Sequence, residues 1–208
     1  MVNISTSSDN GMKECFFMGL RPYPPVINGR INMIKFIEAS TDLVAVVEYF
    51  GPSFAPVKYD MQGNIDKIKK HFIYDENSCL LELMLAQAGK EKIGIGSVLW
   101  LNRAVLFFDI VCTQVLSQTQ ANNNIDVDMR KVFTVAYEGS VKKYHNWATY
   151  MTFTFICKMS PTLPDIIKIF EMENNLKEFR TKVETLHTAL HLVRCKIDEF
   201  FKENKNIY

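Results

Sequence analysis

The chain has 208 residues, of which 48% are apolar, and its 24 basic and 23 acidic side chains leave a formal net charge of +1. This length suits one domain, and the balanced charge gives no indication of a nucleic-acid-binding protein. The first ten residues are polar, so we expect no signal peptide.

The cysteines are odd in number and far apart, and none of them forms a Cys-x-x-Cys pair. This spacing argues against a disulfide framework and against a zinc site built from thiolates. It predicts a protein of a reducing compartment, and we expect the cytoplasm. The five are Cys15, Cys79, Cys112, Cys157 and Cys195.

Residues 1–30 contain several Gly and Pro residues and predict an irregular arm, followed by a domain over residues 31–208. Helical periodicity begins near Ile31 and ends at Gly51-Pro52. We expect a connector at Phe54–Tyr59, then helices at Asp60–Tyr74 and Ser78–Gln87, and a Gly-rich turn before a helix at Ser97–Leu116.

The segment Ser97–Leu116 is the most apolar run of the chain, but it contains Asn102, Arg103 and Asp109. Each charge at the centre of a bilayer costs about 2.5–3.5 kcal/mol. We therefore interpret the run as a buried helix of a soluble protein.

After a polar loop at Ala121–Asn124, we expect one helix that Asp126 or Asp128 caps and that continues to about Met159. A short helix is expected at Asp165–Glu173. The last helix, from Leu176 to Phe200, carries apolar residues in alternating steps of three and four, an a/d seam of nearly four heptads.

That seam allows two interpretations: a coiled-coil dimer, or a long helix lying across a helical layer. The flanks lack a regular charge code at the e and g positions, so we favour the second and expect a monomer. No alternating strand pattern occurs, and the fold class is therefore predicted as all-α.

Four motifs carry polar chemistry. Asp60, Asn64 and Lys67 share one helix face and offer an acceptor, a mixed donor and acceptor, and a cation, a set that can bind hydroxyls and an amide. The same pattern also fits an ordinary solvated face.

The second motif begins with Trp100, the first residue of an apolar stripe that suits a core, although its flat ring could also contact a sugar. The neighbouring Arg103 needs an anion or carbonyl groups if it is buried.

The third motif holds His145, which is either structural or a general base if a reacting group lies within reach. Beside it, Trp147 and Tyr150 with Lys142 and Lys143 form an aromatic and basic cluster of the kind found at membrane interfaces, or a partly buried surface group.

The fourth motif is His187-x-x-x-His191, whose spacing can hold a metal ion. No Glu follows His187, and no third ligand lies nearby in the sequence, so we expect no metal and no cofactor.

Three blocks, in this order, resemble the glycolipid transfer protein family: FAPVKYDMQGNIDKIK at residues 54–69, LWLNRAVLFF at 99–108 and AYEGSVKKYHNW at 136–147. The resemblance extends over about residues 31–208. It implies a two-layer sandwich of about eight helices that encloses an apolar lipid pocket.

The resemblance also implies residue roles. Asp60 accepts from the ceramide amide N–H, and His145 donates to the amide C=O. Asn64 and Lys67 bind sugar hydroxyls, and Trp100 stacks under the sugar. Trp147 matches a residue that the family uses for membrane docking, and Lys143 and Tyr150 of the same aromatic and basic cluster are expected to join it there. Tyr208 is the implied counterpart of a Tyr near the family's C-terminus that touches the sugar.

By this resemblance the protein is a non-enzymatic carrier that moves one glycosphingolipid between membranes and contacts them transiently. Alternatives are a ceramide 1-phosphate carrier, a sphingolipid sensor that does not release its cargo and, from another class, a lipid hydrolase. Two positions depart from the family pattern: Asn102 stands where Lys is frequent, and Asn146 where Gly is frequent.

Overall fold

The computed structural model describes residue 17 and residues 19–119 and 125–207. The predictions for Tyr208, for the loop Ala121–Asn124, for Cys15 and for most of the arm lie outside these residues. The elements are α1 (Met33–Tyr49), the 3-10 turn η1 (Pro52–Phe54), α2 (Ala55–His71), α3 (Leu80–Ala86), α4 (Lys92–Thr119), α5 (Met129–Gly139), the 3-10 turn η2 (Lys142–Tyr144), α6 (Trp147–Lys158), α7 (Leu163–Ile169) and α8 (Leu176–Glu203).

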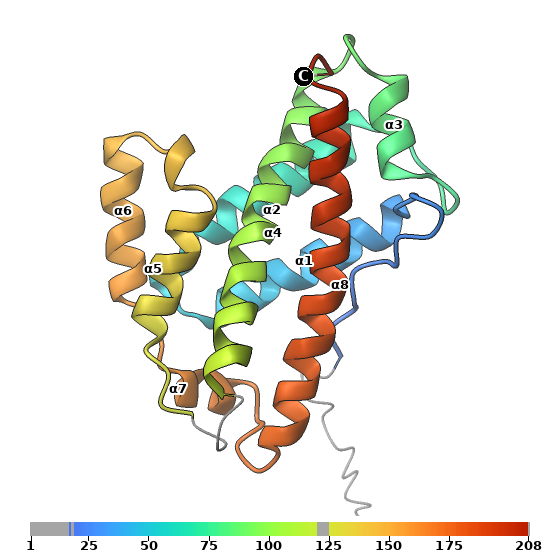
Figure 1. The fold of residues 1–208 in the computed structure, drawn as a ribbon. Coiled ribbons are helices and arrows are strands. Elements are labelled where there is room, and N and C mark those ends of the chain that lie inside the picture. The colour runs from blue at the N-terminus through green and yellow to red at the C-terminus, as the bar shows by residue number, and fades with distance from the viewer. Residues whose placement is uncertain (1–16, 18, 120–124, 208) are drawn as a thin grey trace, which may run out of the picture.

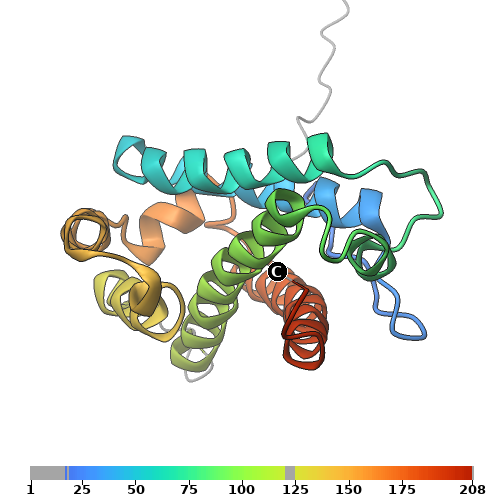
Figure 2. The same ribbon diagram turned by 90° about the horizontal axis from the view of Figure 1, so that it is seen from above.

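The helices form two layers (Figures 1 and 2). Helices α1 and α2 lie together on one side, and α4, α5, α6 and α8 lie on the other. Helix α4 is central, because it packs against α2, α5 and α8. The predicted all-α, two-layer architecture is confirmed, and within the described residues only two isolated β-bridges occur outside the helices.

Helix α4 has the length and hydropathy of a membrane span, but 67% of its most apolar window is buried inside the fold. It is the core helix that the sequence predicted. Helix α8 lies along it (Figure 1), and six residues of the predicted seam are buried: Phe179, Val183, Leu190, Val193, Ile197 and Phe200. The seam therefore packs within this chain.

Two boundaries near α2 and α4 differ from the prediction. Helix α2 begins at Ala55 with Pro56 in its first turn, where proline's fixed φ favours a helix start, so the expected connector is helical. Helix α4 begins at Lys92 and includes Gly94, where a turn was expected. A Cβ atom on Gly94 would lie 2.9 Å from the ring of Phe72 and 3.0 Å from Cβ of His71, so this glycine permits close packing against the end of α2.

The single helix predicted up to Met159 is wrong, because the chain breaks between α5 and α6. Asp128 caps α5 as expected, its carboxylate accepting from the backbone N–H of Lys131. Ser140 then leaves helical geometry, with φ −118° and ψ −85°. Asn146 caps α6 by accepting from the backbone N–H of Thr149 at 2.9 Å. The break folds α6 back against α5 (Figure 1).

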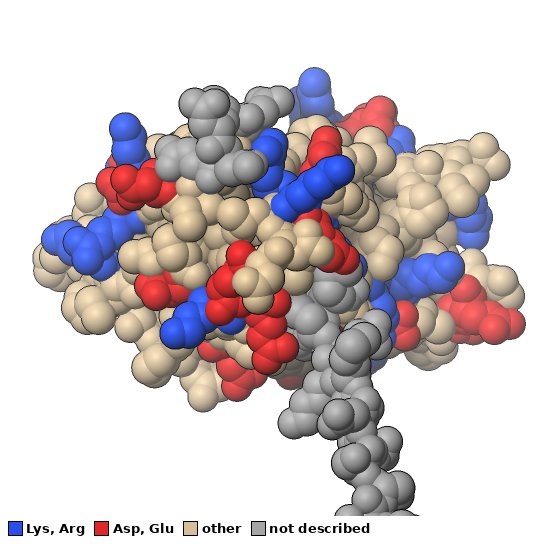
Figure 3. Space-filling view, turned by 90° about the horizontal axis from the view of Figure 1, so that it is seen from below, with Lys and Arg blue, Asp and Glu red and all other residues tan. Residues whose placement is uncertain are grey.

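The described part of the arm packs on the domain. Tyr23 is buried and its hydroxyl lies 3.3 Å from Oγ of Ser40. Arg21 donates to both carboxylate oxygens of Asp42, at 2.9 and 2.6 Å. The face in Figure 3 carries both signs of charge interspersed among uncharged side chains.

Candidate functional site

A surface pocket of about 440 Å³ lies between α2, α4 and the segment from η2 to α6. Five residues singled out in the sequence line it together: Asp60, Asn64, Lys67, Trp100 and His145. They come from three separate segments, so the fold assembles the set that the resemblance implied. Their individual roles in lipid binding stay predictions.

Asp60 and Asn64 form one unit on α2. The Asn64 side chain is buried, and its Nδ2 donates to the backbone carbonyl of Asp60 at 2.9 Å and to the Asp60 carboxylate at 3.4 Å. Although Asp60 is exposed as a whole residue, its pocket position desolvates the carboxyl group and raises its pKa. The charge of His145, when its ring is protonated, and the charge of Lys67 oppose this rise in the pKa of Asp60.

His145 follows η2 in extended geometry. Its Nδ1 lies 3.1 Å from the hydroxyl of Tyr137 on α5. Burial lowers the pKa of His145, while the Asp60 charge opposes that change, so the ring is predominantly neutral at pH 7. If the Tyr137 hydroxyl donates to Nδ1, the ring proton resides on Nε2, which can then donate to a ligand carbonyl. The sequence did not assign Tyr137 any role.

Trp100 and Tyr144 enclose Arg103. The guanidinium carbon of Arg103 lies 4.5 Å from the Trp100 ring centre and 3.5 Å from that of Tyr144. The two aromatic rings meet edge to face at 5.8 Å. The guanidinium of Arg103 therefore contacts two aromatic ring faces, whereas the sequence predicted an anion or carbonyl groups as its partners. Cation–π attraction favours this arrangement. Its Nε is buried without a hydrogen-bond partner among the described residues.

The pocket continues from polar to apolar walls. Phe107, Phe153 and Ile156 line its inner part. The ring of Phe107 stacks on that of Phe133 at 5.7 Å, and Phe133 lines a second cavity of about 70 Å³ whose wall includes Phe108 and Val183. A path of apolar side chains thus leads from the polar mouth into the space between the helical layers.

Helix α6 carries exposed apolar residues beside the pocket. Trp147 is 76% exposed, and Met151 and Phe155, one and two turns further on, are 49% and 59% exposed. Tyr150 is also exposed, with Nζ of Lys142 5.4 Å from its ring centre. The sequence identified Trp147 and Tyr150 but missed Met151 and Phe155, whose spacings of four and eight residues from Trp147 were a visible signal.

The two departures from the family pattern have structural explanations. Asn102 does not line the pocket: it is buried, and its Nδ2 donates to Asp198 of α8 at 2.7 Å. Asn146 does line the pocket and provides the N-cap of α6. His187 and His191 lie on α8, away from this pocket.

Comparison with known proteins identifies the family. A family model described as glycolipid transfer protein matches residues 31–172. A glycolipid transfer protein of Danio rerio is 29% identical over 190 residues, covering 86% of each chain. The crystal structure of the fungal glycolipid transfer protein HET-C2 aligns with a TM-score of 0.79 at 20% identity, covering 93% of this chain and all of the other. Mouse ceramide-1-phosphate transfer protein aligns at 0.72 and 14% identity, covering 86% and 90%. The protein belongs to the glycolipid transfer protein family.

Proposed function

We propose that the protein is a carrier that extracts one glycosphingolipid from a membrane, holds its headgroup in the pocket between α2, α4 and α6, and delivers it to another membrane. As a member of a family of lipid transfer proteins, it is not an enzyme. The observation that carries the proposal is the pocket itself, where Asp60, Asn64 and His145 surround the entrance to an apolar path.

The physical task of a carrier explains this design. The two chains of such a lipid hold about thirty CH₂ groups, each worth about 0.8 kcal/mol on leaving water. Unaided escape from a bilayer is therefore very slow, whereas transfer into an apolar interior exchanges one apolar environment for another. The headgroup then determines selectivity, because a lipid that leaves polar groups of the pocket without a hydrogen-bond partner binds with a less favourable free energy.

An amide and sugar hydroxyls match the polar groups at the mouth. The Asp60 carboxylate accepts from the amide N–H, and His145 donates from Nε2 to the amide carbonyl. Asn64 and Lys67 contact the hydroxyls and Trp100 lies under the ring. Tyr208 completes the sugar contact in this proposal.

A phosphate headgroup fits less well. Among the described residues that line the pocket, Lys67 is the only Lys or Arg, and Asp60 opposes it. The guanidinium of Arg103 is enclosed by Trp100 and Tyr144. Phosphate recognition calls for several cations, so the neutral amide of Asn64 favours sugar.

The carrier contacts membranes through Trp147 and Tyr150 at the start of α6 and Lys143 in η2, and acts as a cytoplasmic monomer. Exposed aromatic and Met side chains next to lysines suit an interface between headgroups and acyl chains. Because these side chains lie beside the pocket, a membrane bound to them would lie close to the point where the headgroup enters.

The decisive experiment measures transfer between vesicles of zwitterionic lipid. Donor vesicles contain either galactosylceramide or ceramide 1-phosphate, and the expected result is rapid transfer of the first and little of the second. Zwitterionic vesicles are used because anionic vesicles would attract Lys142 and Lys143 and so bias the comparison of the two lipids. Preferred transfer of ceramide 1-phosphate would overturn the sugar assignment, and extraction without delivery would identify a sensor. Mass spectrometry of the recovered lipid, expected to be unaltered, addresses the hydrolase alternative.

A further inference from the structure

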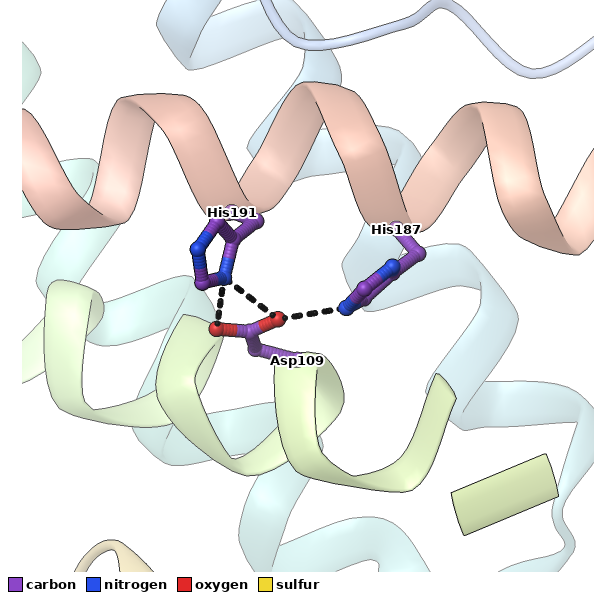
Figure 4. Close-up of side chains that lie close together, drawn as sticks. All are labelled: Asp109, His187 and His191. Carbon is purple, nitrogen blue, oxygen red and sulfur yellow. Dashed lines mark hydrogen bonds and ion pairs between the residues drawn. The ribbon is translucent and has the colours of Figure 1, made fainter. Parts of the chain in front are cut away.

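A cluster of metal-ligating side chains lies where α4 meets α8, separate from the lipid pocket (Figure 4). Asp109 of α4 is buried and faces two histidines, His187 and His191, which are one turn apart on α8. Asp109 precedes the histidines by 78 and 82 positions, so no local pattern in the sequence joins the three residues. In three dimensions, Asp109 is the third potential ligand that His187 and His191 lack nearby in the sequence.

The distances are close to those of a metal site. Oδ1 of Asp109 lies 3.0 Å from Nε2 of His187 and 3.1 Å from Nδ1 of His191. One ligand atom from each residue lies within 4.8 Å of the others. Ligands placed about 2.0–2.1 Å from a tetrahedral Zn²⁺ are about 3.3 Å apart, so small side-chain movements suffice. We propose that Asp109, His187 and His191 bind one divalent transition-metal ion of the zinc class.

The surroundings support a carboxylate that offers one oxygen. Nε of Arg194 donates to Oδ2 of Asp109 at 2.7 Å, which orients the carboxylate so that Oδ1 faces His187, while Nδ1 of His191 lies 3.1 Å from Oδ1 and 2.9 Å from Oδ2. Such hydrogen bonds to the unused ligand atoms orient metal ligands in proteins. Sγ of Cys195 lies 3.5 Å from Nε2 of His191, the ring nitrogen opposite to the proposed ligand.

The charge balance also permits a cation. Asp109 and Asp198 both pair with Arg194, at 2.7 Å each, so the cluster carries one net negative charge when both histidines are neutral. Imidazole nitrogens with a carboxylate oxygen select zinc-class metals over Mg²⁺ and Ca²⁺, which prefer all-oxygen sites. The His191 side chain is 47% exposed, so an ion and a completing water molecule can reach the site.

The ion competes with hydrogen bonds that the same atoms form without it. Nε2 of His187 also lies 3.0 Å from Oγ1 of Thr113, and Nδ1 of His191 contacts both oxygens of Asp109. Metal binding moves each ring proton to the opposite nitrogen and weakens in acid, where the rings bind protons. The ion would connect α4 to α8 and stabilise the fold, without taking part in headgroup binding.

The test uses the full chain, reduced and treated with a chelator, and titrates it with Zn²⁺ in a calorimeter. One equivalent is expected to bind, and at 100 times the Kd the Tm should rise by about 5–10 °C. The variant His191→Ala, at an exposed position, and the double variant H187A/H191A should lose the Tm shift. The matched control His71→Ala, whose imidazole pairs with Glu91 elsewhere, should keep it.

A second measurement separates this site from binding by cysteine. The Co²⁺-loaded protein should show the visible bands of a tetrahedral nitrogen and oxygen site, without thiolate charge-transfer absorption, and Cys195→Ser should retain them. Absence of binding in the wild type, unchanged binding in H187A/H191A, or a thiolate band would each overturn the proposal. Vesicle transfer by the chelated wild type should continue, which keeps this test independent of the proposed function.

Discussion

The hydroxyl of Tyr137 lies 3.1 Å from Nδ1 of His145, and this contact joins α5 to the segment that precedes α6. Tyr137 also stacks on Phe153, with ring centres 4.3 Å apart and planes at 9°. Tyr137 thus helps to position His145, although Tyr137 is not among the described residues that line the pocket. If its hydroxyl donates to Nδ1, it favours the tautomer in which Nε2 can donate.

Replacing Tyr137 by Phe keeps the aromatic stack and removes only the hydroxyl. We expect glycolipid affinity to fall by about three- to tenfold, as for one lost hydrogen bond, with an unchanged helical circular dichroism spectrum. The nitrogen NMR shifts of His145 should show a loss of the Nε2-protonated form. Tyr59→Phe is the control, since Tyr59 is exposed beside Asp60 on α2. An unaltered tautomer in Y137F would contradict this role.

The raised pKa of Asp60 predicts both a pH dependence and a stability effect. Because desolvation is the main cause and raises the pKa in the folded state, the folded protein binds this proton more tightly than the unfolded chain. The carboxylate therefore lowers stability as pH rises through the window between the ordinary and the raised pKa, and the loss persists at pH 7.

The variant Asp60→Asn should accordingly raise the Tm of the lipid-free protein at pH 7 and weaken glycolipid binding by about tenfold, since a neutral acceptor replaces a charged one. In the wild type, glycolipid affinity should fall on acidification, beginning at a pH above the ordinary pKa of an Asp carboxyl group. The D60N variant should not show this fall in affinity. Tm and affinity measured from pH 7 down to 4 check both effects. A lower Tm for D60N at pH 7 would contradict the assigned cause.

Asn64→Lys tests the headgroup class. The side chain at position 64 is 5% exposed, so an ammonium there would pair with the Asp60 carboxylate and could not accept from a hydroxyl. We expect galactosylceramide transfer to fall by about tenfold or more. Gln62→Lys adds the same charge to α2 outside the pocket and should transfer normally. Undiminished transfer by N64K would remove Asn64 from the site.

The exposed apolar residues of α6 (Trp147, Met151 and Phe155) predict that their replacement impairs membrane contact but not lipid binding. The double variant W147A/F155A should reduce vesicle binding by about 100-fold or more, because two large side chains each contribute roughly 1.5–3 kcal/mol when buried. Binding of a short-chain, water-soluble glycolipid should remain unchanged. Ile73→Ala is the matched control: Ile73 is 93% exposed but follows the end of α2 that leads to α3, opposite α6 in Figure 2. Equal losses in both variants would argue against docking by α6.

The sequence predicted much of the fold and of the polar site, for different reasons. Helical periodicity predicts that Asp60, Asn64 and Lys67 share one helix face, but the same pattern fits a solvated face, and the family resemblance was needed to assign them to a site. The prediction that this face lies beside Trp100 and His145 came from the family resemblance, because no local pattern connects three segments that are so far apart in the sequence.

The errors arise where tertiary packing overrides local preference. Gly94 resembles a turn residue but lies within α4, where the close approach of Phe72 leaves no room for a side chain. The break between α5 and α6 lacks proline, and its signals were the weaker ones of Gly139 at the end of α5 and Asn146 as a cap. Tyr137 was missed because its partner lies across that break.

The small size of the inner cavity affects how the carrier works. Aromatic side chains such as Phe107 and Phe133 pack between the layers, and the cavity that Phe133 lines measures about 70 Å³. Acyl chains can enter there only if these side chains move apart, so loading is coupled to repacking of the core. A carrier that only exchanges lipid adds no free energy of its own, so the net flow of lipid runs from the membrane in which its chemical potential is higher to the one in which it is lower.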